Sequence, residues 1–185
     1  MKRGWKWTAF TYQGTNDELS HLHPFEWSYV VEASENRLKR AYKFQIEFSM
    51  HCFTRRPRSD ESVPEDLWYR DSVEERVFCF DRYQLSHRLP AIIKELGSRK
   101  CMHTSGKNSF LTTELITKKG KEIEYEVYFN VTRAHRGGGW LNITVKSAYE
   151  RTQNHPSKKP KRKRRIRFDV IAYNRQLGKE IHPAG

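Results

Sequence analysis

Alternating apolar and polar residues in the second half of the chain constrain the fold more than any other feature. In residues 122–133, EIEYEVYFNVTR, the apolar side chains fall on one parity. Residues 139–149, GWLNITVKSAY, begin with the same period, because Leu141, Ile143 and Val145 alternate with polar side chains. Successive side chains of a strand point to opposite faces, so both segments predict strands with one buried face.

Turn sequences separate these segments from further strand candidates. TKKGK, AHRGGG and NRQLGK are short and glycine-containing, which favours antiparallel pairing of the strands that they join. We therefore predict an α+β fold, in which an antiparallel β-sheet meander packs on one main helix and an extra N-terminal β-rich portion precedes it. The other expected strands lie at about 5–13, 26–32, 42–54, 100–104, 108–116 and 165–173.

Residues 81–98, DRYQLSHRLPAIIKELGS, are the best helix candidate. Leu85, Leu89 and Leu96 recur at helical spacing, and Gly97 suits the left-handed position after a helix end. Pro90 cannot donate the backbone hydrogen bond of a helix interior, so the segment is either a kinked helix or a turn followed by a second helix. We favour the break.

Size and composition are those of a chain with one well-filled core. With 185 residues, of which 36% are hydrophobic, we expect one domain over 1–185. Within it, 55–76 is predicted to be a charged loop and 157–165 a basic flexible segment. The three cysteines are widely spaced, which favours free thiols in a reducing cytoplasm, and no apolar run is long enough for a membrane helix.

The distribution of charge indicates the class of partner. The formal net charge is +13, yet residues 1–97 hold equal numbers of basic and acidic side chains, so the whole excess lies in 98–185. Such a field attracts polyanions through counterion release, and nucleic acid is the commonest polyanionic partner. We predict binding to nucleic acid, RNA preferred, alone or within a nucleoprotein complex, and no membrane.

Basic and polar side chains supply the predicted nucleic-acid contacts. The run SKKPKRKRRIR, 157–167, is the densest group, and its alternative interpretation is a solvated loop or an import signal. Lys107 lies in TSGKN, which is interpreted as a hairpin turn, and Arg136 lies in a glycine-rich turn. The predicted nucleic-acid-binding residues are Arg55, Arg56, Lys107, Arg136, Lys146, Ser147, Lys158, Lys159, Lys161, Arg162, Lys163, Arg164, Arg165 and Arg167.

Two segments combine groups suited to metal-independent RNA cleavage. His51 lies on the polar parity of the strand predicted at 42–54, where Arg55 and Arg56 follow, so an acid–base imidazole would lie beside phosphate-binding cations. Ser147, Tyr149 and Arg151 continue the apolar parity of their strand, which predicts that its core-facing row turns polar. The alternatives are an inert surface histidine and a tyrosine that caps the core with its hydroxyl in water.

Neither a metal site nor a cofactor is predicted. Cys101 and His103, even when combined with His51 and Cys52, do not reproduce the ligand spacing of structural zinc sites, and the sequence contains no phosphate-binding glycine loop.

A helix followed by an antiparallel meander bearing His, Arg and Tyr resembles the fold of barnase-like enzymes and bacterial toxin endoribonucleases. The resemblance covers about 81–173 and rests on element order and residue type. It implies an RNA-binding sheet face, metal-free attack by a 2′-hydroxyl group, and catalytic groups drawn from His51, Arg133, Tyr149 and Arg151.

Three functional hypotheses follow from the sequence. The first is an RNA-binding protein with metal-independent endoribonuclease activity. The second is a non-catalytic nucleic-acid-binding accessory or inhibitory factor of a phage or mobile element. The third is a basic protein that docks on an acidic protein surface, and charge does not separate the three.

Overall fold

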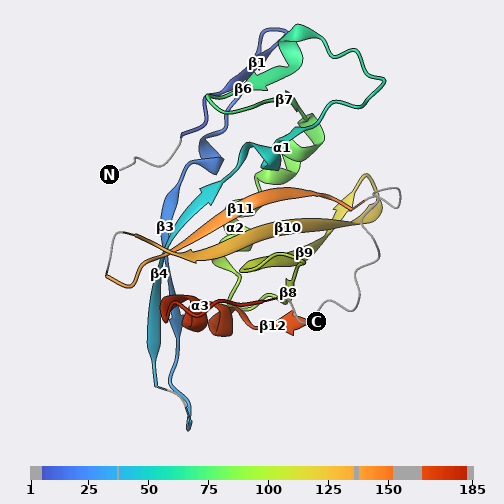
Figure 1. The fold of residues 1–185 in the computed structure, drawn as a ribbon. Helices are drawn as coiled ribbons and strands as arrows, with labels where there is room; N and C mark the ends of the chain where they lie inside the picture. Colours follow the sequence, from blue (N-terminus) through green and yellow to red (C-terminus); the bar gives the residue numbers. More distant parts are fainter. Residues whose placement is uncertain (1–5, 37, 136–137, 152–163, 183–185) are drawn as a thin grey trace.

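A seven-stranded sheet dominates the computed structural model, which describes residues 6–36, 38–135, 138–151 and 164–182 (Figure 1). The architecture is mixed α/β and rich in strands. Strand β4 and the first half of β11 have the apolar-inward alternation expected from their sequences. In spatial order the strands are β12 (Arg165–Ile166), β8 (Cys101–His103), β9 (Ser109–Lys118), β10 (Lys121–Arg133), β11 (Leu141–Glu150), β4 (Arg40–Phe48) and β3 (Phe25–Val31).

The meander predicted for the second half is confirmed. Strands β8, β9, β10 and β11 pair in sequence order, and every neighbouring pair is antiparallel. Lys119 and Gly120 join β9 to β10 in a two-residue turn with φ of 49° and 73°. Positive φ at both positions is typical of a type I′ turn, whose twist matches that of the flanking strands.

The N-terminal part of the chain is rich in strands, as predicted, but two of these strands belong to the main sheet. Strand β4 pairs in parallel with β11, and β3 pairs with β4 in an antiparallel hairpin, so both extend the main sheet. Figure 1 shows the distal end of this hairpin projecting beyond the other strands. The sequence did not indicate this pairing because parallel neighbours that lie about a hundred residues apart leave no local signal.

Two small sheets lie at the opposite end of the molecule from the hairpin tip (Figure 1). The segment 55–76 had been predicted as a loop, but it contains a 3-10 turn and strands of the second small sheet. One sheet pairs β1 (Phe10–Tyr12) with β2 (Thr15–Asp17). The other has the spatial order β5 (Thr54–Arg55), β7 (Glu75–Phe78) and β6 (Trp68–Arg70). The 3-10 turns are η1 (Ser20–Leu22), η2 (Met50–Cys52) and η3 (Glu65–Leu67).

The single main helix of the prediction is not confirmed, because the described residues form three α-helices. The break near Pro90 is confirmed: α1 (Phe80–Ser86) ends before α2 (Leu89–Lys94), and Pro90 lies in the first turn of α2, where no backbone donor is needed. After α2, Gly97 lies so close to Tyr29 that an added Cβ would be 2.4 Å from the ring atom Cε2. Glycine is required there by close packing.

The strand predicted at 165–173 is also wrong. Only Arg165 and Ile166 are extended, and α3 (Phe168–Gln176) follows. The buried residues Phe168, Ile171, Ala172 and Arg175 recur at helical spacing, a pattern that the local alternation concealed. Gly178, at φ 75°, receives the chain after the helix in the left-handed region.

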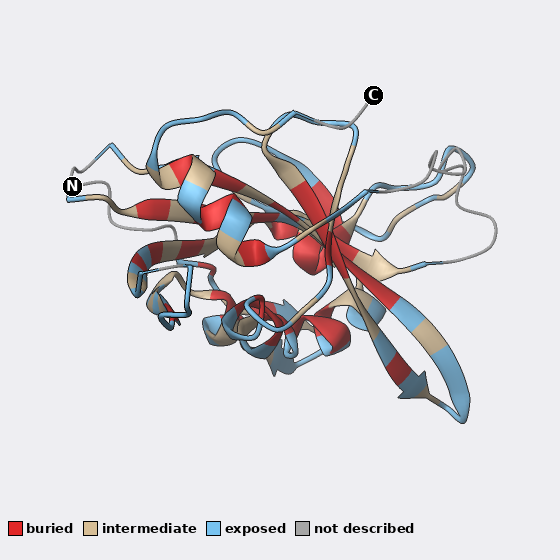
Figure 2. Cartoon of the chain, turned by 90° about the horizontal axis from the view of Figure 1, so that it is seen from below, coloured by how far each residue is buried: buried red, intermediate tan, exposed pale blue. Residues whose placement is uncertain are grey.

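One connected hydrophobic cluster packs between the inner face of the main sheet and the helices. The inward residues Tyr125, Val127, Phe129 and Val131 of β10 are fully buried in it. The buried apolar side chains of all three helices belong to the same cluster. Figure 2 shows buried residues concentrated in this region. The described residues at the tip of the β3–β4 hairpin, 32–36 and 38–39, are exposed.

Candidate nucleic-acid interface

A β-bulge at Lys146 reverses the parity of β11. On β10, Tyr128 lies opposite Ser147 but its neighbour Phe129 lies opposite Val145, so Lys146 has no partner. Beyond the bulge, Ala148 is fully buried and takes the inward position. The prediction that the core-facing row turns polar is therefore wrong. A bulge adds one residue to a strand and moves all later side chains to the other face.

The outer face of the sheet carries a row of side chains in register across five strands. Arg165 lies opposite Met102, Met102 opposite Leu111, Leu111 opposite Tyr128, and Tyr128 opposite Ser147. Directly opposite residues share a face, and at strand spacings of about 4.8 Å the row is about 19 Å long. We call these five residues the outward row. It places a cation from the C-terminal region on the same face of the sheet as the polar end of β11. Within the row Leu111 is fully buried, Met102, Tyr128 and Ser147 are half-buried, and Arg165 is exposed.

An aromatic and cationic stack adjoins the outward row at β11. The rings of Tyr128 and Tyr149 stack with centroids 5.5 Å apart, and the guanidinium of Arg82 lies 5.2 Å from the Tyr149 ring centre. The Tyr128 hydroxyl donates to Glu126 Oε2 at 2.6 Å, and Arg151 lies 3.8 Å from the other oxygen of that carboxylate. Burial and the neighbouring carboxylate raise the pKa of Tyr128, so the phenol remains a neutral donor.

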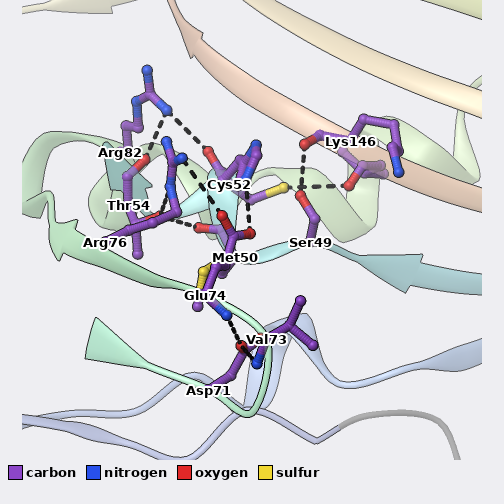
Figure 3. Close-up of polar contacts among 12 residues, drawn as sticks. Ser49, Met50, Cys52, Thr54, Asp71, Val73, Glu74, Arg76, Arg82 and Lys146 are labelled. Carbon is purple, nitrogen blue, oxygen red and sulfur yellow. Dashed lines mark hydrogen bonds and ion pairs between the residues drawn. The ribbon is translucent and has the colours of Figure 1, made fainter. Parts of the chain in front are cut away.

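A second polar cluster surrounds η2, beside the bulged end of β11 (Figure 3). His51 Nε2 lies 2.9 Å from Glu74 Oε1. Arg76 is buried, donates from Nε to the Thr54 hydroxyl at 2.9 Å and lies 3.8 Å from Glu74. Arg82 Nη1 donates to the main-chain carbonyls of His51 and Thr54 at 3.1 and 2.7 Å, which holds the turn against α1.

The charge states in this cluster follow from its burial. Desolvation, and then the positive charge of Arg76, lower the pKa of His51 despite the hydrogen bond that the imidazole donates to Glu74, so the imidazole is neutral near pH 7. Desolvation also lowers the pKa of Arg82. Burial raises the pKa of the Cys52 thiol to about 12, which makes it a poor nucleophile at neutral pH.

The turn η2 is tied directly to the bulge. The hydroxyl of Ser49 donates to the carbonyl of Lys146 at 2.6 Å, and the backbone N–H of Ser49 donates to the carbonyl of Val145. Strand β4 ends at Phe48, so His51 lies on this turn and not on the strand predicted at 42–54. The histidine nevertheless approaches the end of β11 that carries Tyr149.

Most of the predicted residues near β11 are brought together. Ser147, Tyr149 and Arg151 share the outer face, and Lys146 is exposed at the bulge. Arg82 links His51 to Tyr149, because its guanidinium contacts both the main-chain carbonyl of His51 and the Tyr149 ring. Arg164 and Arg165 are exposed at the start of β12.

Other predicted residues lie elsewhere or have acidic partners. Arg133 is at the opposite end of β10, seven residues or about 23 Å from Glu126. Arg55 pairs with Glu61, Lys107 with Glu180 and Arg167 with Asp169, whereas Arg56 is exposed. The predicted contacts Arg136, Lys158, Lys159, Lys161, Arg162 and Lys163 lie outside the described residues.

Sequence reasoning missed four residues of this region. Tyr128 carried a signal, since it is an aromatic side chain on the polar parity of its strand. Glu74, Arg76 and Arg82 lie in charged segments where nothing local distinguishes them, because their roles depend on contacts with η2 and β11. Among the described parts of the chain, no group of three or more His, Cys, Asp and Glu side chains could hold a metal ion.

The three cysteines, Cys52, Cys79 and Cys101, are free thiols, as predicted. In the parts of the chain that the structure describes, none of the helices combines the length and the apolar character needed to cross a membrane.

Comparison with known proteins places almost the whole chain in one family. Residues 9–176 match the YjaZ family. Protein YjaZ of Escherichia coli (strain K12) is 29% identical over 179 residues, which cover 95% of this chain and 94% of that protein. No solved structure matches the chain.

These matches correct the resemblance to barnase-like and toxin endoribonucleases, which is wrong. The matched region includes residues 9–80, which that resemblance left unexplained, and those residues supply two strands of the main sheet. A helix followed by a meander is too general a pattern to identify a fold family. The chain belongs to the YjaZ family.

Proposed function

We propose that this protein binds RNA through the exposed cations at the two ends of the outward row and through the half-exposed rings of Tyr128 and Tyr149 beside it. The register of the sheet is the observation that supports this proposal most directly. It aligns Arg165, at the end of the basic run, with Tyr128 and Ser147 on one face. Cations that grip phosphate beside aromatic and polar side chains that contact bases are typical of single-strand RNA sites.

Charge at the two ends of the row supports the same ligand. Arg164 and Arg165 at one end and Lys146 at the other are exposed, and none of the three has an ion pair with a residue that the structure describes. The described residues hold 26 basic and 22 acidic side chains, so their net charge is small compared with the +13 of the whole chain. Unpaired cations therefore matter more for binding than the basic residues already neutralised by carboxylates.

Fluorescence anisotropy against salt tests the proposal. The probe is a labelled single-stranded 12-mer of uridine, and the variant combines Lys146→Gln, Arg164→Gln and Arg165→Gln. Each lost phosphate contact should reduce the log–log salt slope by about 0.7, so the triple variant should reduce it by about 2. The matched control removes three cations of the first half: Lys39→Gln, Arg70→Gln and Lys94→Gln. Equal slopes for the two triple variants would contradict the proposed surface.

A second candidate function, metal-independent cleavage of the bound RNA, is favoured by the His51–Glu74 contact beside Arg82. With Nε2–H donating to Glu74, the Nδ1 atom of neutral His51 accepts the 2′-hydroxyl proton. The 2′-oxygen attacks the adjacent phosphorus, and the 5′-oxygen leaves with a proton from solvent. The products are a 2′,3′-cyclic phosphate and a 5′-hydroxyl end, with arginine stabilising the phosphorane charge.

Cleavage of labelled RNA in EDTA separates the two functions. Removal of the base in His51→Ala should lower the rate by 10²- to 10⁴-fold, and Glu74→Gln should lower it less, since Glu74 only orients the imidazole. Absence of cleavage by the wild-type protein would contradict catalysis. Binding without cleavage would fit the alternative of an accessory or inhibitory factor of a phage or mobile element. The cytoplasmic location stays a prediction.

A further inference from the structure

We propose that two copies of the chain associate by antiparallel pairing of their β3 strands about a two-fold axis at Ser28. Strand β3 is the last strand of the main sheet, so no other strand of the described residues pairs with its outer edge. The backbone groups of such an edge are a template for a further strand. The pairing would join two seven-stranded sheets into one, and it is independent of the proposed RNA binding.

Strand β3 lacks the features that usually protect an edge strand from pairing. Its sequence, FEWSYVV, contains neither lysine nor proline, and its register with β4 runs unbroken over all seven residues, so it has no bulge. Aromatic and β-branched residues, which favour strands, make up most of it. The opposite edge of the sheet, β12, has only two residues and is protected by its shortness.

The end of the β3–β4 hairpin is also too narrow to be stable alone. Strand β4 pairs with β11 only over Phe44–Phe48, so its residues 40–43 have β3 as their only strand neighbour among the described residues. Figure 1 shows this part projecting from the sheet. A two-stranded ribbon is marginally stable in water, and pairing with a second hairpin would make the projection four-stranded.

The apolar layer beneath the sheet is left partly open at β3. Trp27 and Tyr29 point towards the helices, because their rings contact Phe168 of α3 at centroid distances of 5.7 and 5.3 Å. These two rings and Phe25 are half-buried, although their partners across β4 are at most 1% exposed. A strand beside β3 would cover the exposed parts of the three rings.

Exposed apolar side chains are concentrated at the same end of the molecule. The described residues include eight exposed large hydrophobic side chains, and five of them lie on the β3–β4 hairpin or on α3: Val30, Leu38, Val170, Tyr173 and Leu177. The hairpin and α3 are in contact, since the Arg40 guanidinium lies 4.0 Å from the Tyr173 ring centre. Clustered exposed apolar side chains are typical of surfaces that contact another protein.

The sequence of β3 favours a second copy as the occupant, because the strand is complementary to itself. With the axis at Ser28, the helix-facing row places Trp27 opposite Tyr29 of the partner subunit, and Phe25 opposite Val31 of the partner subunit. Aromatic and β-branched residues that lie directly opposite each other stabilise a strand pair.

The other face of β3 is complementary in the same register. Glu26 is the only charged residue of the strand, and it lies opposite Val30 of the partner subunit, so the two Glu26 carboxylates do not face each other. Ser28 lies opposite its own copy. Because one seven-residue strand edge is small compared with the standard interface of about 800 Å² per partner, we expect a dissociation constant in the micromolar range.

Sedimentation equilibrium of charge variants tests both the dimer and its register. Val30 is 45% exposed, so the fold of one chain tolerates a charge there. Val30→Glu places a carboxylate opposite the partner's Glu26, whereas Val30→Lys places an ammonium group opposite it. Two symmetry-related pairs should make the dissociation constant of Val30→Glu about 2- to 30-fold larger than that of Val30→Lys.

The matched controls are Val73→Glu and Val73→Lys, which change an exposed valine between β6 and β7 and should leave the dissociation constant unchanged. A wild-type protein that stays monomeric up to about 200 µM would overturn the proposal and leave the edge to a strand of another protein. Equal dissociation constants for the two Val30 variants would also overturn it.

Disulfide cross-linking locates the axis independently. In the proposed pairing, the Cα atoms of the two Ser28 residues lie about 4.5–5.5 Å apart, within the range that a disulfide spans. Mild oxidation of Ser28→Cys should therefore produce a covalent dimer that reducing agent separates. The control Glu26→Cys should not cross-link, because its two copies are offset by four residues, or about 13 Å. Equal cross-linking of the two variants, or cross-linking of Glu26→Cys alone, would refute the axis at Ser28.

Discussion

Replacement of Arg82 by methionine should destabilise the protein through η2. The substitution keeps an apolar stem of similar length and removes the two bonds from Nη1 to the carbonyls of His51 and Thr54. Hydrogen bonds from a charged group contribute about 1.5–3 kcal/mol each, and the contact with the Tyr149 ring adds about 0.5–1 kcal/mol. Relief of the desolvation that lowers the pKa of Arg82 offsets part of this loss. We expect a net loss of about 2–3 kcal/mol.

Urea unfolding measures this loss directly. With a slope of about 2–3 kcal/mol per molar urea, the midpoint should fall by about 1 M. The control Arg88→Met removes an exposed arginine that pairs with Glu114 and should shift the midpoint by less than about 0.4 M. A loosened η2 should also expose the buried thiol of Cys52 to iodoacetamide, which peptide mass spectrometry detects. A midpoint within about 0.2 M of wild type, with Cys52 still protected, would refute the role assigned to Arg82.

Three further predictions test the packing and the bulge. Gly97→Ala should lower the free energy of unfolding by about 1–3 kcal/mol, measured by thermal or urea unfolding, because the added Cβ would lie 2.4 Å from the Tyr29 ring. Tyr29→Leu in the same chain should recover part of this loss, whereas additive effects of the two substitutions would contradict the contact. Ala148→Asp should destabilise by more than about 3 kcal/mol while Ser147→Asp costs less than about 1 kcal/mol, because the bulge turns Ala148 inward; the reverse order would disprove it. Burial lowers the pKa of His21 to about 4, so the stability that the neutral imidazole contributes is complete above pH 6.5 and is lost as the pH falls towards 4. A fully buried group with this shift would contribute about 3 kcal/mol, and solvent screening reduces the contribution to about 1–2 kcal/mol. His21→Gln should therefore flatten the dependence of the unfolding free energy on pH between 6.5 and 4.

The local patterns of the sequence predicted the meander well. Alternation in 122–133 and 139–149 corresponds to β10 and β11, and the Lys119–Gly120 turn joins its strands as expected. The helix break at Pro90 was predictable for the same reason, since a missing N–H is a property of the residue alone. Where two periods fit one segment, as in 165–173, packing of Phe168 and Ile171 against the core selected the helix.

The candidate site was predicted in its residue types and not in its geometry. Tyr149, Ser147 and His51 were identified as exceptions to their local patterns, yet the face on which the first two lie was predicted incorrectly. The bulge at Lys146 depends on how β11 pairs with β10, and nothing in the sequence of β11 alone shows an unpaired residue. The partners Glu74, Arg76 and Arg82 come from segments that reach η2 only through the fold.

By itself, the sequence determined the strand-rich class, the positions of most strands, the free thiols and the uneven charge, because each depends on composition or on contacts between near neighbours. Tertiary structure alone decided that β4 lies parallel to β11, that the residues after Lys146 change faces and that Arg165 aligns with Tyr128 and Ser147. These outcomes depend on pairing between strands far apart in the chain. Their register minimises the exposed apolar area of the whole sheet, a quantity that no single segment contains.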